Sequence, residues 1–214
     1  MVSLEVIVSV LLVVLTVIGT YLANAHFQRK FALVERLWDE KFKGLTRIFE
    51  TLSDIGDIIV EVGSIQTTVE KMAKTPIEKI QLLNLECLSI SKRHSIPIDE
   101  LPTIDPLTSG IADESLIAET KSKMMIKLLF KAQDYSFSFL SETSDITLIL
   151  YDQSILLDAA AINQHMLDTM HKAASEPLDP NKEADTIHIM MKKLREKSIT
   201  ELNRTKLSKF PWFK

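Results

Sequence analysis

The stretch VIVSVLLVVLTVIGTYL, residues 6–22, decides how the chain must be arranged, because it carries no charged side chain. With its flanking apolar residues it provides roughly 20 residues, or about 30 Å of helix, which is enough to cross the hydrocarbon core of a bilayer. We therefore predict a single-pass transmembrane anchor over residues 1–25, with the lipid bilayer as its first partner.

Basic residues lie on one side of this stretch only. No Lys or Arg precedes it, whereas Arg29, Lys30 and Arg36 follow it closely. The positive-inside rule then places the N-terminus outside the cell and the rest of the chain in the cytoplasm. The lone cysteine excludes an intrachain disulfide and fits that reducing compartment. The predicted localisation is the cell membrane, with a cytoplasmic domain.

The same stretch allows a second interpretation, a signal peptide that is cleaved after Ala25. Ala23-Asn24-Ala25 has the small-x-small form of a cleavage site. The missing basic n-region and the acidic Glu5 argue against cleavage. An exported helical protein is therefore kept as an alternative to the anchored one.

One face of the predicted membrane helix carries hydroxyl groups, on Ser9, Thr16 and Thr20. Small and hydroxyl side chains let membrane helices approach closely and form hydrogen bonds across the contact. These residues would line an interface between membrane helices, and they motivate a sharper hypothesis of a pore-forming or membrane-perturbing effector.

A heptad pattern follows the apolar stretch and continues without proline to Lys74. Apolar residues at alternating steps of three and four predict a long amphipathic or coiled-coil helix over residues 26–75. We expect this seam to join copies of the chain, although the same face can instead pack against helices of its own chain. Lys41 and Gln66 occupy its two polar positions. Its apolar members are Phe31, Val34, Trp38, Leu45, Ile48, Leu52, Ile55, Ile59, Val62 and Val69.

Residues 76–214 are predicted to form a cytoplasmic helical domain. Residues 135–151 fit either a kinked helix or a β-hairpin, because Tyr135, Phe137 and Phe139 alternate with polar residues. We favour the helix, because an isolated hairpin is marginal and no third strand is in sight. The other expected helices run from Ile77 to about Arg93, from about Glu114, from Asp152 to Ala174, and from about Glu183 to Lys206. The predicted fold class is mainly α, a membrane helix continuing into a long helix and then a small bundle.

Two Asp-x-x-His pairs are the main candidates for chemistry. Asp168 with His171, and Asp185 with His188, place a carboxylate and an imidazole on one helix face, as in di-iron bundles. Those sites use Glu in place of Asp and add two further Glu residues. We keep a helical-bundle metalloenzyme as an alternative, but expect no enzyme activity, no metal and no cofactor.

The C-terminus joins three aromatic residues to lysines. Lys209, Phe210, Trp212 and Phe213 suit a bilayer interface or a groove on a partner protein, or they cap the bundle. The net charge of −4 includes no basic stripe, so we expect no nucleic-acid partner. The leading expectation is an oligomeric sensor, scaffold or membrane effector subunit.

Overall fold

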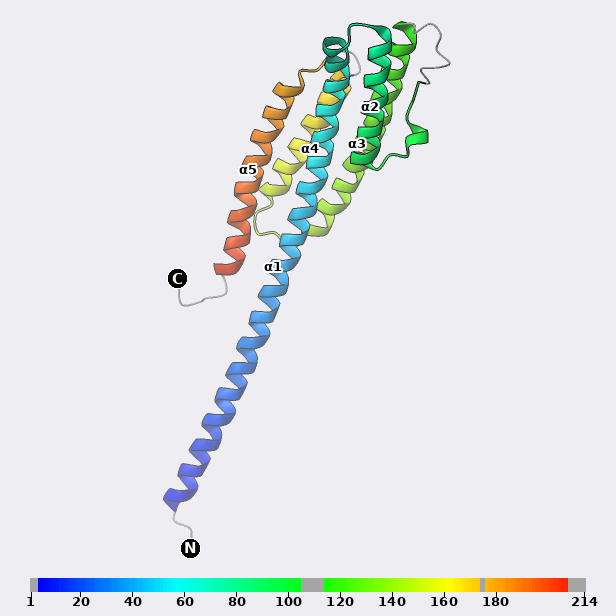
Figure 1. Ribbon diagram of the computed structural model, residues 1–214. Coiled ribbons are helices and arrows are strands. Elements are labelled where there is room, and N and C mark those ends of the chain that lie inside the picture. Colours follow the sequence, from blue (N-terminus) through cyan, green and yellow to red (C-terminus); the bar gives the residue numbers. More distant parts are fainter. Residues whose placement is uncertain (1–3, 105–113, 174–175, 208–214) are drawn as a thin grey trace.

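The computed structural model describes residues 4–104, 114–173 and 176–207, without the side chains of residues 4–11, 68, 70, 206 and 207. Within these ranges it is built from helices and no strand, as the predicted mainly α fold class requires (Figure 1). The elements are α1 (Leu4–Met72), α2 (Pro76–His94), a 3-10 helix η1 (Ile98–Glu100), α3 (Glu114–Ile146), α4 (Ser154–Ala173) and α5 (Pro180–Leu207).

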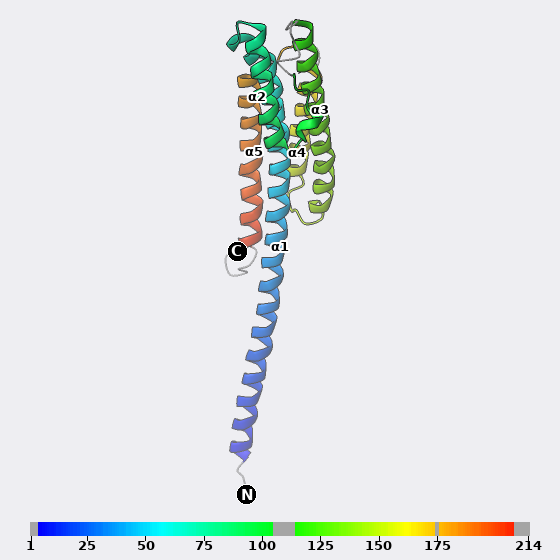
Figure 2. The ribbon, with the colours of Figure 1, turned by 45° about the vertical axis from the view of Figure 1, so that its right-hand side comes forward.

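The longest element, α1, is one continuous helix of 69 residues. Its N-terminal half projects alone from the molecule, whereas its C-terminal half lies alongside α2, α3, α4 and α5 (Figures 1 and 2). The bundle therefore has α1 as its central pillar. A continuous helix over the heptad region confirms the predicted long helix.

The core of the bundle contains most of the predicted oligomer seam. Seven seam residues are only 0–3% exposed, because α3, α4 and α5 cover them with apolar side chains such as Leu128, Phe139, Ile155, Ile162 and Leu194. These residues are therefore not available as an interface between copies, and the structure replaces this part of the seam with an intrachain core. They are Leu45, Ile48, Leu52, Ile55, Ile59, Val62 and Val69.

Glycines let neighbouring elements approach the pillar. A Cβ at Gly44 would lie 2.6 Å from Cδ1 of Ile146, the last residue of α3. At Gly63 a Cβ would lie 3.1 Å from Cβ of Pro180, the first residue of α5. Both contacts bring an end of a helix directly onto the backbone of α1, which helps to fix where those helices start and stop.

The favoured helix over residues 135–151 is confirmed as far as Ile146, and the alternative β-hairpin is wrong. Helix α3 continues to Ile146, and residues 147–153 form the connection to α4. The reason is that Leu128, Ala132, Phe139 and Ile146 share one helical face, which is buried in the core. In the helix the backbone N–H and C=O groups are paired within the segment while that face is buried.

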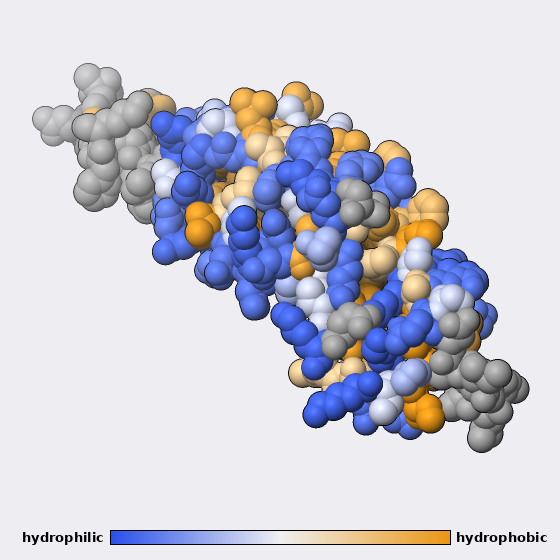
Figure 3. Space-filling model, turned by 90° about the horizontal axis from the view of Figure 1, so that it is seen from above, coloured by the Kyte–Doolittle hydropathy of each residue, from blue (hydrophilic) through white to orange (hydrophobic). Residues whose placement is uncertain are grey.

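No helix is long and apolar enough to cross a membrane, as far as the described side chains extend. That range covers residues 12–22 of the apolar stretch of residues 6–22, so the predicted 1–25 anchor lies partly outside it. The far end of the bundle has a mainly hydrophilic surface with scattered hydrophobic patches (Figure 3). Scattered patches of this kind are ordinary for a folded protein.

Candidate functional site

A buried ion pair lies at the point where α1 enters the bundle. The side chain of Lys41 on α1 is 0% exposed and that of Glu201 on α5 is 1% exposed. Lysine and glutamate are almost never buried to this extent unless they are paired. The distance from Lys41 Nζ to Glu201 Oε1 is 2.5 Å, which meets that condition.

The ammonium group of Lys41 has a partner for each of its three N–H donors. It donates to Glu201 Oε1, donates to Thr205 Oγ1 at 3.0 Å, and lies 3.8 Å from the centroid of the Tyr151 ring. Together these contacts replace the water that the charge loses on burial. Lys41 therefore joins α1 to α5 inside the bundle, which explains why a polar residue occupies a position of the apolar seam.

The carboxylate of Glu201 connects three parts of the chain. Its Oε1 also accepts a hydrogen bond of 2.7 Å from the backbone N–H of Tyr151, in the connection between α3 and α4. One side chain thus joins α1, α5 and that connection. Separating α5 from α1 at this joint would leave an uncompensated buried charge, which is costly.

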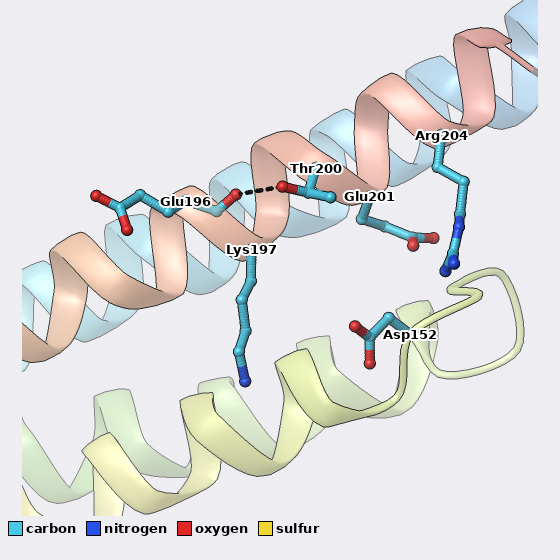
Figure 4. Close-up of a pocket in the computed structure, with 6 residues that line it drawn as sticks. All are labelled: Asp152, Glu196, Lys197, Thr200, Glu201 and Arg204. Atoms are coloured by element: carbon cyan, nitrogen blue, oxygen red, sulfur yellow. Dashed lines mark hydrogen bonds between the residues drawn. The ribbon is translucent and has the colours of Figure 1, made fainter.

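A shallow pocket of about 220 Å³ lies beside this joint, between α4 and α5 (Figure 4). The hydroxyl of Thr200 donates to the Glu196 carbonyl at 3.0 Å, and Lys197 pairs with Asp158 of α4. The lining residues are Asp152, Glu196, Lys197, Thr200, Glu201 and Arg204. Five of these six side chains are charged, so the pocket is suited to ionic contacts.

Asp152 in this pocket also begins α4. Its Oδ1 accepts a hydrogen bond of 2.9 Å from the backbone N–H of Ser154. Hydrogen bonds from the Ser154 side chain and backbone lower the pKa of Asp152, and the nearby Lys197 and Arg204 act in the same direction. Asp152 therefore stays ionised as a helix cap at neutral pH.

The second polar seam residue, Gln66, fastens the opposite end of the bundle. Its Nε2 donates to the Ala173 carbonyl at 2.8 Å, and its Oε1 accepts from the Leu178 N–H at 2.8 Å. Gln66 therefore holds both sides of the connection between α4 and α5. The two polar seam positions mark the two ends of the packed half of α1.

A third polar cluster, partly buried, joins α2 to α1. His94 Nε2 lies 2.6 Å from Glu61 Oε2, and Arg93 Nη1 lies 2.7 Å from Glu61 Oε1. One turn earlier on α1, burial raises the pKa of Asp57, and the Glu61 carboxylate raises it further against the opposing effect of His94. Sequence analysis missed this cluster, since only the fold brings residues 61 and 94 together.

The first part of the seam, Phe31, Val34 and Trp38, lies on the projecting half of α1. Phe31 is exposed there, while Val34 and Trp38 are half-buried. The ring of Trp38 stacks on that of Phe42, with centroids 5.2 Å apart. These three seam residues are therefore less buried than the seven that the bundle covers.

The hydroxyl groups of the predicted membrane face bond to their own helix. Thr16 Oγ1 donates to the Leu12 carbonyl and Thr20 Oγ1 to the Thr16 carbonyl, both at 2.8 Å. The Ser9 side chain lies outside the described residues. So do Lys209, Phe210, Trp212 and Phe213, the predicted membrane or partner contact.

The two Asp-x-x-His pairs do not form a shared site. Asp168, His171, Asp185 and His188 are all exposed, and Asp168 accepts a hydrogen bond of 2.8 Å from Gln164. In the described ranges no group of three or more His, Cys, Asp or Glu side chains is placed to hold a metal ion. The geometry gives no support to the metalloenzyme alternative.

Comparison with known proteins brings no relative: no protein-family model, no curated protein and no solved structure matches this chain. The geometry of the chain must therefore carry the functional conclusion by itself.

Proposed function

We propose that this protein is a membrane-anchored helical scaffold, in which the first part of α1 crosses a bilayer and the rest of α1 holds the bundle away from it. The observation that carries the proposal is a sleeve of exposed apolar side chains around the projecting half of α1. Its aliphatic members are 48–62% exposed, and they are Leu12, Val13, Val14, Leu15, Val17, Ile18 and Leu22.

This apolar sleeve surrounds the helix on all sides. Consecutive residues of an α-helix point about 100° apart, so Leu12, Val13, Val14 and Leu15 together cover its whole circumference. A surface helix of a soluble bundle has one apolar stripe, whereas a helix that is apolar all round suits a bilayer. The Thr16 and Thr20 hydroxyls already bond to their own helix, as lipid burial requires.

Aromatic and basic residues flank the apolar sleeve on its bundle side. Tyr21, Phe27 and Phe31 are exposed there, beside Arg29 and Lys30. Aromatic rings favour the membrane–water interface, and basic residues favour the cytoplasmic side. The proposal therefore keeps the orientation with the bundle in the cytoplasm.

The length of helix between the apolar sleeve and the bundle sets the distance of the bundle from the membrane. From Leu22 to Lys41 there are 19 residues of unbroken helix, which is about 28 Å at 1.5 Å per residue. A rigid spacer of this length would present the bundle to partners at a fixed height above the membrane. The seam residues Phe31, Val34 and Trp38 lie within the spacer, outside the bundle core, and we propose that copies associate along this segment.

Insertion of charge into the apolar sleeve tests the anchor. Two arginines, Leu15→Arg with Ile18→Arg, should cost about 5–7 kcal/mol of membrane insertion. The matched control is Leu33→Arg, at an exposed leucine of the same bare helix beyond the sleeve. In flotation of vesicles made with the full chain, the wild type and control should float with lipid and the double variant should not. Equal flotation of all three would contradict the anchor.

Orientation is tested by thiol labelling. The native Cys87 is buried and its pKa is raised to about 11 by that burial, so its background reaction is low. A membrane-impermeant maleimide added outside intact cells should label Ser3→Cys and spare Ser141→Cys, which is exposed on α3. Labelling of Ser141→Cys instead would reverse the proposed orientation.

Association is tested by the mass of the detergent-solubilised particle. The wild type should give more than one subunit, and Phe31→Asp with Val34→Asp should give a single subunit. The matched control is Glu35→Gln with Asp39→Asn, which changes charge on the same exposed segment. A single-subunit mass for the wild type would remove the assembly while leaving the anchor intact.

A further inference from the structure

A groove of about 610 Å³ lies between α3 and α4, on the bundle and away from the apolar sleeve. Its walls are mainly apolar, and Phe130 and Phe137 are both more than 60% exposed along it. Leu140 of α3 and Leu167 of α4 add to the walls. Mainly apolar clefts of 300–1,000 Å³ with a few polar groups are the usual form of ligand sites.

The floor of this groove contains a buried polar pair. Asn163 on α4 is 7% exposed, and its Nδ2 donates a hydrogen bond of 3.0 Å to Ser136 Oγ on α3. Both residues line the groove. In the described structure the other amide atom, Asn163 Oδ1, is buried and has no hydrogen-bond partner.

An unpaired buried carbonyl oxygen is costly, because it has lost its water without gaining a donor. A molecule in the groove that brought one N–H or O–H to Asn163 Oδ1 would remove that cost. An acceptor at the same place, such as an ether or ester oxygen, would not. The floor therefore selects for a ligand with a hydrogen-bond donor.

The walls select for a long and neutral ligand. Along α3 the lining extends from Ile126 to Leu140, which is about 21 Å of helix. The lining residues of the groove include no Lys, Arg, Asp or Glu. Apart from the imidazole of His171, the lining offers no ionisable side chain that could balance a charged ligand.

We propose that this groove binds a neutral long-chain molecule carrying one hydroxyl or amide N–H donor, which donates to Asn163 Oδ1 while the chain lies against Phe130, Phe137 and Leu167. This site is independent of the anchor, since none of its residues lies on α1.

The test uses the full chain in lipid nanodiscs and a decanol that carries a photoreactive diazirine on its alkyl chain. After illumination, mass spectrometry locates the adducts, which are expected on residues 126–140 or 163–171. Unlabelled decanol and decyl methyl ether then compete with the probe. Decanol should compete about three- to tenfold better than the ether, because only decanol donates a hydrogen bond.

Variants separate the hydrogen bond from simple partition into lipid. In Asn163→Ala the preference for decanol over the ether should fall to about one, whereas the matched Asn203→Ala on exposed α5 surface should keep it. Leu167→Trp, which fills the groove and leaves Asn163 in place, should remove the adducts. This second variant keeps the test valid should Asn163→Ala fold poorly by circular dichroism.

Three results would overturn the proposal. The first is that wild-type adducts occur only outside the two ranges, as expected if a second copy or a partner helix fills the groove. The second is that decanol and the ether compete equally in the wild type. The third is that the preference persists in Asn163→Ala.

Discussion

The two halves of α1 share one heptad pattern and one continuous helix, yet they have opposite surroundings. In the C-terminal half the seam residues from Leu45 onward are buried by helices of the same chain. In the N-terminal half Phe31 is 54% exposed and Leu33 is 67% exposed. The comparison shows that a heptad pattern specifies a helix and its apolar face, but not whether the covering partner is the same chain, another copy or lipid.

The two halves also differ in how their charged side chains are paired. Lys41 lies at the entry to the packed half, and its charge is matched by Glu201. Arg36, five residues earlier, pairs with Glu40 on the surface, where the Arg36 side chain is 79% exposed. An ion pair between a basic residue and a glutamate is thus buried on one side of the boundary and exposed to solvent on the other. Substitutions on the two sides should therefore have different effects on stability.

The largest effect is expected at the buried pair. Lys41→Met should lower the free energy of unfolding by about 3–5 kcal/mol, because Glu201 would remain buried without a counter-charge. Arg36→Ala should change it by less than about 1 kcal/mol. Urea titration of the full chain in detergent measures both values.

A rescue experiment shows whether the uncompensated charge is the cause. Lys41→Met combined with Glu201→Gln should recover most of the loss, because glutamine is neutral and still accepts from the Tyr151 N–H. A double variant as unstable as Lys41→Met alone would indicate that lost packing is responsible.

The next largest effect is expected at a buried leucine, which is compared with an exposed leucine of the same helix. Leu52→Ala should lower the free energy of unfolding by about 2–5 kcal/mol, because the side chain is fully buried and a cavity remains. Leu33→Ala, on the exposed half, should leave it within about 0.5 kcal/mol in the same urea titration. Similar losses at both positions would break the distinction between the halves.

A smaller effect is expected at the far end of the packed half. Gln66→Leu should cost about 1–3 kcal/mol, since it removes the hydrogen bonds to the Ala173 carbonyl and the Leu178 N–H. Gln81→Leu, at an exposed position of α2, is the control and should be close to neutral. Equal stability of the two variants would mean that Gln66 does not fasten the connection.

The smallest effect concerns pH. Because the pKa of Asp57 is raised in the folded state, chiefly by burial, the protonated folded form is favoured and stability falls as pH rises from about 4 through that raised pKa. Asp57→Asn should therefore raise the melting temperature at pH 7 and have no effect near pH 3. Solvent screening limits the gain to a few tenths of a kcal/mol.

Thermal melts between pH 3 and pH 8 measure this difference. Asp39→Asn, on the exposed half of α1, is the charge-matched control. If Asp57→Asn raised the melting temperature by the same amount across that pH range, titration of the Asp57 carboxyl would be excluded as the cause.

The helices could be predicted from the sequence with small errors at their ends. The predicted 77–93 helix is α2, Pro76–His94, and the predicted 152–174 helix is α4, Ser154–Ala173. The last helix begins earlier than predicted, at Pro180. That proline occupies the first turn, while Asp179 Oδ1 accepts from the backbone N–H groups of Asn181 and Lys182. Proline is also common just after the end of a helix, so Pro180 by itself does not mark the start of α5.

The polar joints could not be predicted in the same way. Lys41 and Gln66 stood out as polar residues in an apolar seam, but their partners are more than 100 residues away along the chain. Asn163 gave no signal, because its missing hydrogen bond becomes visible only once α3 and α4 are placed. Periodicity reports which face of a helix is buried, whereas pairings between distant residues depend on the packing of whole helices.

The central position of α1 has a consequence for synthesis on the ribosome. Lys41 is translated 160 residues before Glu201, its partner. At 5–20 residues per second, the Lys41 ammonium is made roughly 10–30 s before the carboxylate that neutralises it. Helices α2, α3 and α4 are complete before α5, so the buried ion pair is among the last contacts of α1 that synthesis makes possible.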